Sequence, residues 1–203
     1  MRLPMFPLGT VLFPHMILPL HVFEERYRVL TRRCLDGDPL FGVVLIARGS
    51  EVGGGDERSD VGTVARIAEA AELEDGRYVL VTVGTERLRV ARWLDDDPHP
   101  WAEVDLLDDI AVPRMDTLVA PVVARLRRVL ALLSELGVGV APATVELSDD
   151  ALARSWQVAT LAPLGPLDAQ RVLEVDDAAE RVALLDRLLG EREDDLTLQI
   201  AGG

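Results

Sequence analysis

Four prolines divide the most apolar stretch of this chain, and their spacing restricts the fold more than any other feature. The stretch runs from Leu3 to Tyr27 and reads LPMFPLGTVLFPHMILPLHVFEERY. Proline fixes φ and has no N–H, so it suits the end or the edge of a strand better than the middle of a hydrogen-bonded ladder. We therefore predict two or three short, buried, extended segments, each stopped by a proline. The prolines are Pro4, Pro7, Pro14 and Pro19.

The period of the apolar residues changes after His21. Four of them then recur at spacings of four, three and four: Phe23, Tyr27, Leu30 and Cys34. This spacing is typical of one face of a helix, and Gly37 is a helix stop. The sequence therefore predicts a strand-rich segment that leads directly into a short amphipathic helix.

The chain continues to residue 110 with the patterns of strands. Leu40–Ala47 is a continuous apolar run and predicts a central strand, whereas the polar, glycine-rich Arg48–Asp60 predicts an exposed loop. Asp75-Gly76 is a hairpin signal, and Tyr78–Val83 is apolar on both of its faces, which indicates a strand buried on both sides. At least six strands with short connections fit a closed or nearly closed antiparallel β-structure.

Beyond the composition shift at Asp108–Pro113 the apolar period is helical. Ser148 is a good N-cap for one helix, and Asp176 or Asp177 caps the last one. The predicted fold class is α+β, with a β-rich lobe over residues 1–110 and a helical lobe over residues 111–203.

The N-terminal pattern LPxFPLGxVLFPxMxLPLxVFExRY resembles the start of the N-terminal domain of Lon-type ATP-dependent proteases, and the bacterial proteins built from that domain alone. Two later segments agree with the resemblance. They are Val61–Ile67, followed by an acidic hairpin, and Leu173–Asp177, which leads into Glu180-Arg181. The resemblance implies a PUA-like β pseudo-barrel with one packed helix, followed by a C-terminal helical bundle.

The resemblance also implies a function. In Lon-type proteases this domain is similar in role to an entrance that selects unfolded or tagged proteins, and an ATPase and a Ser–Lys peptidase follow it. Neither part is found in this sequence, so we expect a non-catalytic protein- or peptide-binding module and no enzyme activity. The expected partners are unfolded or tagged polypeptide segments.

Charge and composition exclude several classes of function. The formal net charge is −14, which disfavours binding to nucleic acid and to anionic membranes. The chain has no lysine, so a Walker-type phosphate loop, a Ser–Lys dyad and a Schiff-base lysine are all impossible. The single Cys34 cannot form an internal disulfide, and no apolar run is long enough to span a membrane. We expect a cytoplasmic monomer or weak dimer without cofactors.

No reactive or metal-binding constellation emerges from the remaining candidates. The histidines His15, His21 and His99 match no metal template with Cys34, and no serine lies in a nucleophile elbow. Asp95-Asp96-Asp97 lacks the alternating spacing of a calcium loop.

Four apolar residues form the candidate peptide-binding patch: Phe13, Met16, Ile17 and Leu18. They either pack in the core or form an exposed patch that docks unfolded segments, because large apolar patches on soluble proteins usually mark binding sites. We expect Phe13 in the core and Met16 nearer the surface. The family-motif residues Glu24, Arg26 and Tyr27 are expected to be structural.

Two other function classes stay open at this point. One is a small-ligand-binding or enzymatic protein that uses a cleft between the two lobes. The other is an RNA binder, since PUA-like folds sometimes bind RNA, although the charge of −14 counts against it.

Overall fold

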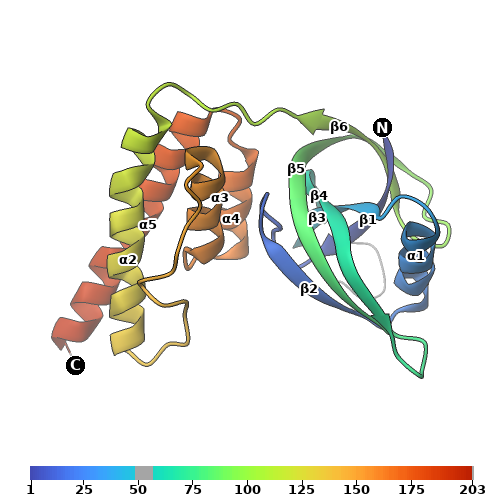
Figure 1. The fold of residues 1–203 in the computed structure, drawn as a ribbon, viewed down its shortest axis with the longest axis horizontal. Coiled ribbons are helices and arrows are strands. Elements are labelled where there is room, and N and C mark those ends of the chain that lie inside the picture. The colour runs from blue at the N-terminus through green and yellow to red at the C-terminus, as the bar shows by residue number, and fades with distance from the viewer. Residues whose placement is uncertain (49–56, 203) are drawn as a thin grey trace. The chain divides into compact units, whose positions relative to one another are not determined.

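The computed structural model describes residues 1–48 and 57–202 and divides into two compact units, Met1–Asp108 and Asp109–Gly203. Its described residues form a six-stranded sheet and five helices, which confirms the α+β class (Figure 1). The strands are β1 (Arg2–Leu8), β2 (Ile17–Val22), β3 (Leu40–Arg48), β4 (Glu57–Glu72), β5 (Tyr78–Leu94) and β6 (Trp101–Leu107). Gly53-Gly54-Gly55 and the rest of residues 49–56 lie outside the described residues.

The strands of the first unit pair with one another in a closed circuit. The order is β2-β5-β4-β3-β1-β6, and β6 pairs in addition with β5, so that β1, β3, β4, β5 and β6 form a closed circuit. The sheet is mixed, because β1 and β3 run parallel while the other pairs are antiparallel. β3 lies between β1 and β4, as its continuous apolar sequence predicts. β2 pairs only with β5 among the described residues, so it is an edge strand.

The prolines do not stop the strands, contrary to our prediction. β1 runs through Pro4 and Pro7, and β2 runs through Pro19. Backbone bonds from Met5 to Pro100 and from Val104 to Met1 fix which residues of β1 bond to β6. Because bonded and non-bonded residues alternate along a ladder, Pro4 is in a non-bonded pair with β6. By the same alternation, Pro7 has its backbone directed away from β3.

The same alternation explains Pro19. Gly84 donates its N–H to the carbonyl of Met16, which makes Leu18–Thr82 the next bonded pair and Pro19–Val81 a non-bonded one. The missing N–H of Pro19 therefore faces the free edge of β2. Pro7 and Pro19 thus occupy positions at which the ladder needs no donor, and Pro4 precedes the first residue of β1 that pairs with β3, so the strands continue through them.

The hairpin at Asp75-Gly76 joins β4 to β5, and Gly76 has the positive φ of 76° that favours glycine there. Two expectations for this region are wrong. Residues 57–60 belong to β4 and not to a loop. β5 is buried on one face only, because Tyr78 and Leu80 are buried whereas Val79 is exposed.

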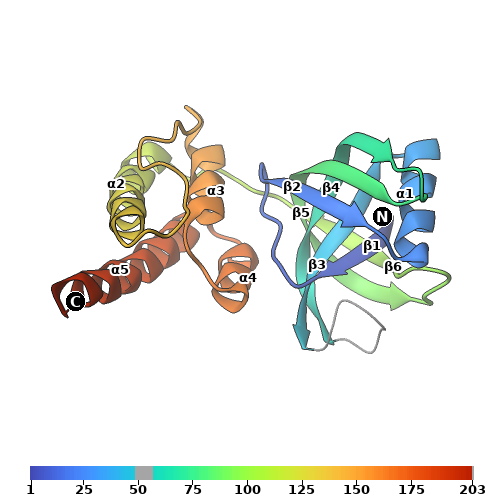
Figure 2. The ribbon, with the colours of Figure 1, turned by 90° about the horizontal axis from the view of Figure 1, so that it is seen from below.

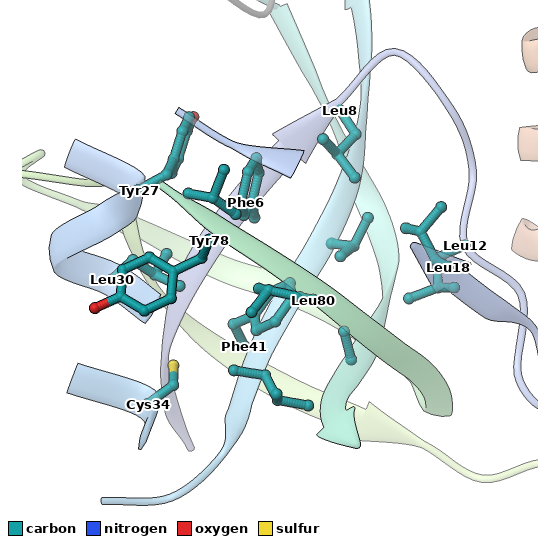
Figure 3. Packing of buried hydrophobic residues seen from close by; sticks show 14 residues of the cluster. Phe6, Leu8, Leu12, Leu18, Tyr27, Leu30, Cys34, Phe41, Tyr78 and Leu80 are labelled. Atoms are coloured by element: carbon teal, nitrogen blue, oxygen red, sulfur yellow. The ribbon is translucent and has the colours of Figure 1, made fainter. Parts of the chain in front are cut away.

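Helix α1 (Glu25–Asp36) packs on the sheet and completes the larger core of this unit. Tyr27, Leu30 and Cys34 project from its buried face toward Phe6 and Phe41 of the strands (Figure 3). In both ribbon views α1 lies alongside the curled sheet (Figures 1 and 2). Phe23 does not belong to this helix face, contrary to our prediction, because the helix begins two residues later.

The second unit contains α2 (Met115–Glu135), α3 (Ala151–Leu161), α4 (Pro166–Glu174) and α5 (Ala178–Gly202). Asp177 caps α5, accepting bonds from the N–H groups of Ala179 and Glu180, as predicted. The predicted cap of α3 is wrong, because Asp150 and not Ser148 accepts from a backbone N–H of the first turn, that of Ala153. Ser148 instead accepts a bond from the N–H of Asp150.

Candidate functional site

Residues of β1, β2 and the start of α1 line a pocket of about 280 Å³ in the first unit. β1 contributes Phe6 and Leu8, β2 contributes residues 18–22, and Phe23 and Tyr27 complete the apolar wall. The pocket lies beside the free edge of β2, where the proline-rich sequence leaves the ladder without a neighbouring strand. It is therefore an apolar hollow in the surface beside an edge strand, which is paired on one side by β5.

The four residues of the predicted patch do not share one environment. Phe13 and Leu18 are buried, with 4% and 8% of their surfaces exposed, and Met16 is partly buried against the core. Ile17 is 64% exposed. Leu18 is the only one of the four that lines the pocket. The alternation of β2 separates them, since Ile17 and Leu18 point to opposite faces of the strand.

Phe23 is the residue that sequence reasoning placed wrongly. It is 57% exposed and forms part of the pocket wall, just before α1. Phe23 is four residues before Tyr27, which is the spacing of a helix face, and the sequence therefore placed it on the helix and not in the pocket wall. The acidic pair Glu24-Glu25 was the available signal, because acidic residues favour the first turn of a helix and so mark its start after Phe23.

The motif residues after Phe23 hold the wall of the pocket in place. Glu24 accepts from Arg26 at 3.0 Å, and the Arg26 guanidinium lies 4.5 Å from the centre of the Tyr27 ring. Tyr27 stacks on Phe6 with ring centres 4.0 Å apart and an angle of 9° between the planes (Figure 3). These contacts join α1 to β1, and they leave Glu24 as a charged group in a mainly apolar wall.

The three histidines and the cysteine occupy different environments. His15 and His21 are exposed, while His99 is fully buried with Nδ1 3.2 Å from the carbonyl of Pro100. Burial lowers the pKa of His99. Cys34 is a buried thiol in α1. Across residues 1–48 and 57–202, no group of three or more His, Cys, Asp or Glu side chains is arranged to hold a metal ion.

Residues 2–191 match the model of the ATP-dependent protease La (LON) substrate-binding domain. The chain belongs to this family. The Lon substrate-binding domain thus accounts for both units, and the pocket lies within the motif through which the sequence resembled it.

Full-length relatives and solved domains agree with this assignment. The chain is 27% identical to a Lon protease of Trichlorobacter lovleyi and 27% identical to the Lon protease of Escherichia coli K12, over 97% and 96% of its length. It spans about a quarter of the length of these curated relatives, 25% in each case.

Two solved structures share the fold. A Lon N-terminal domain protein from Xanthomonas campestris is 29% identical with a TM-score of 0.66, covering 94% of this chain and 98% of that one. The N-terminal domain of a Mycobacterium avium complex Lon protease has a TM-score of 0.65 at 18% identity, covering 96% and 99%, and shows the fold alone. None of the helices in the described part of the chain has the length and apolar character needed to cross a membrane.

Proposed function

We propose that this Lon substrate-binding domain binds unfolded or tagged polypeptide segments through the pocket beside β2, without any catalytic activity of its own. The observation that carries the proposal is the pocket itself, an apolar hollow with the 57% exposed ring of Phe23 in its wall. An exposed aromatic ring next to an apolar hollow offers an unfolded chain a place to bury its own apolar side chains.

The edge of β2 supports recognition by side chains over recognition by strand addition. A chain that adds to an edge strand needs a continuous row of backbone donors and acceptors. The ladder register directs the backbones of Ile17, Pro19 and His21 to the free edge, and the middle one has no N–H. Proline on an edge is a common protection against strand pairing. We therefore expect side chains of the client to enter the pocket without extending the sheet.

Exposed apolar side chains continue from the pocket onto the outer face of β2 and β5. Ile17 lies opposite Val83 in the ladder, and His21 lies opposite Val79, which is 39% exposed. Cross-strand neighbours on one face lie in contact distance of each other. The face thus adds a second apolar surface over which a client segment extends.

The test is the binding of a permanently unfolded, carboxymethylated polypeptide to the full chain, measured by fluorescence anisotropy. Phe23→Ser should weaken binding by about tenfold, because burial of a phenylalanine contributes about 1.5–3 kcal/mol. Leu198→Ser is the matched control, since Leu198 is 72% exposed on α5 in the other unit. Equal affinities for the two variants, with unchanged thermal melts, would remove the pocket as the binding site.

The finer assignments of fold and activity form part of the same proposal. The closed strand circuit with α1 packed on it supports a PUA-like pseudo-barrel, and the four helices from Met115 onward support a C-terminal bundle. We propose that the protein works in the cytoplasm, hydrolyses no ATP and cleaves no protein. Purified chain with ATP and Mg²⁺ should release no phosphate, and turnover that persists through further purification would overturn this part.

A further inference from the structure

A second cleft in the first unit gathers arginines around one tryptophan. The Arg2 guanidinium lies 4.6 Å from the centre of a Trp101 ring, and that of Arg33 lies 5.1 Å from it. Arg2 comes from β1, Arg33 from α1 and Trp101 from β6, so three elements distant in sequence build the arrangement. Stacking on an indole holds a guanidinium in one plane and leaves its N–H edges free to donate.

Neither arginine forms a salt bridge among the described residues, although Arg2 lies opposite Glu103 in the ladder and its charge contributes to lowering the pKa of Glu103. The neighbouring Arg92 shows the contrast, because it forms a pair with Glu103 at 2.8 Å. Two cations held at one ring repel each other, and a bound anion would relieve that repulsion. Two adjacent guanidinium groups with free N–H edges suit a carboxylate group.

The cleft also offers an apolar hollow and acceptors for N–H donors. Both arginines line a pocket of about 240 Å³ whose walls include Leu3, Pro4 and Leu40. Arg2, Arg33 and Trp101 also line a second, larger and more polar space. Three carboxylates also line the cleft: Asp38, Asp95 and Asp97. A ligand that satisfies all of these groups carries one carboxylate, one apolar side chain and N–H donors.

We propose that this cleft binds the C-terminal residue of a polypeptide whose last side chain is apolar. The terminal carboxylate lies between the guanidinium groups of Arg2 and Arg33, the side chain enters the hollow, and backbone N–H groups face the aspartates. The choice of a polypeptide rests on the proposed function, while the cleft itself is separate from the pocket beside β2.

The test measures binding of a labelled octapeptide that ends in leucine, once with a free carboxylate and once with a C-terminal amide. The chain is tagged only at its own C-terminus, because Met1 lines the hollow. The free acid should bind at least about tenfold more tightly than the amide, and the preference should decrease with salt. Arg2→Gln and Arg33→Gln should each abolish it. Arg171→Gln is the control, since Arg171 is exposed and pairs with Asp168 on α4.

Three results would overturn the inference: equal binding of acid and amide, an unchanged preference in both arginine variants, or complete displacement of the peptide by millimolar inorganic phosphate, which would indicate a general anion site. The unfolded client with an amidated C-terminus separates this inference from the proposed function. If one of those three results occurs while that client still binds and Phe23→Ser weakens its binding, only the C-terminal site fails. If it does not bind at all, the proposed function fails independently.

Discussion

The guanidinium group of Arg181 lies 3.8 Å from the centre of the Trp156 ring, and both side chains donate to the carboxylate of Asp109. Arg181 and Trp156 are fully buried, so the charge is removed from water and depends on its partners. Arg181 is on α5 and Trp156 is on α3, whereas Asp109 precedes α2. One carboxylate therefore connects three separate segments of the helical unit.

Removal of that carboxylate should destabilise the helical unit strongly. Asp109→Ala removes a carboxylate that accepts from the buried Arg181 cation, and the loss of one member of a buried ion pair typically costs about 3–5 kcal/mol. Urea unfolding followed by far-UV circular dichroism measures the change. Arg187→Ala is the control, because Arg187 and Glu191 form an exposed pair worth less than about 1 kcal/mol. Similar losses in both variants would show that the network adds nothing.

Gly62 should tolerate no side chain. A Cβ at this position would lie 2.1 Å from the backbone carbonyl oxygen of Val43 on the adjacent strand, which cannot move without disturbing the ladder. We expect Gly62→Ala to lower the free energy of unfolding by at least about 1–3 kcal/mol. Gly139→Ala has no atom within 4 Å of its added methyl group and should be neutral. Thermal melts of the two variants make the comparison.

The observed cap of α3 predicts an unequal effect of two neighbouring substitutions. Asp150→Ala removes the acceptor of the Ala153 N–H and should cost about 1 kcal/mol. Ser148→Ala removes only an acceptor outside the helix and should cost less. Chemical denaturation measures the two losses of stability. A larger loss for Ser148→Ala than for Asp150→Ala would support Ser148 as the N-cap, as predicted from the sequence.

Cys34 should resist thiol reagents in the folded protein. Burial raises its pKa from 9.0 to about 11, so at pH 8 its thiolate fraction is about a hundredfold below that of an unperturbed thiol. The pKa of Cys34 is higher in the folded protein than in the unfolded one. The contribution of the protonated thiol to the stability of the fold is therefore complete below about pH 8.5 and is lost as the pH rises toward 11. Rapid labelling without urea would contradict the burial, and Cys34→Ala should lack this part of the alkaline destabilisation.

We propose that the two compact units are separate domains, which trypsin can test. Arg114 is exposed just before α2, near the start of the second unit and four positions after the exposed Ile110. Because the chain has no lysine, trypsin cuts only after arginine. Cleavage after Arg114 should precede cleavage at the arginines within α2, and Arg114→Gln should remove that product in mass spectra. Early cuts inside α2 would contradict the division.

Local patterns predicted much of the fold because their physical causes are local. The continuous apolar run of β3, the Asp75-Gly76 turn and the Asp177 cap all depend on residues within a few positions of one another. The prediction that prolines stop the strands was wrong because a strand position needs an N–H only when it forms a hydrogen-bonded pair with a residue of the neighbouring strand. In β1 that partner is about 100 residues away, and no local pattern specifies it.

The candidate site was less predictable for the same reason. Ile17 is exposed because it lies on the outer face of β2, whereas Leu18 on the opposite face is buried, and which face of a strand is covered is a property of the whole topology. Phe13 is just as apolar, yet the segment that contains it packs against Gly84, where an added Cβ would lie 2.2 Å from the Phe13 carbonyl oxygen. The pairing of Arg2 and Arg33 around Trp101 joins three elements that no sequence spacing connects.

The closed strand circuit requires that β1 be synthesised well before its partner β6. The Met1 amine bonds to the carbonyl of Val104, 103 positions later, so β1 is made first and waits for β6 before the circuit can close. During that interval β1 is an apolar strand without its neighbours, a species that tends to pair with other chains. Pro7 removes a backbone donor at a position where the finished ladder needs none, and Pro4 removes another at the start of β1, before the residues that pair with β3. The nascent strand is thereby a poorer template for aggregation, and at Pro7 this protection costs the folded protein no ladder hydrogen bond.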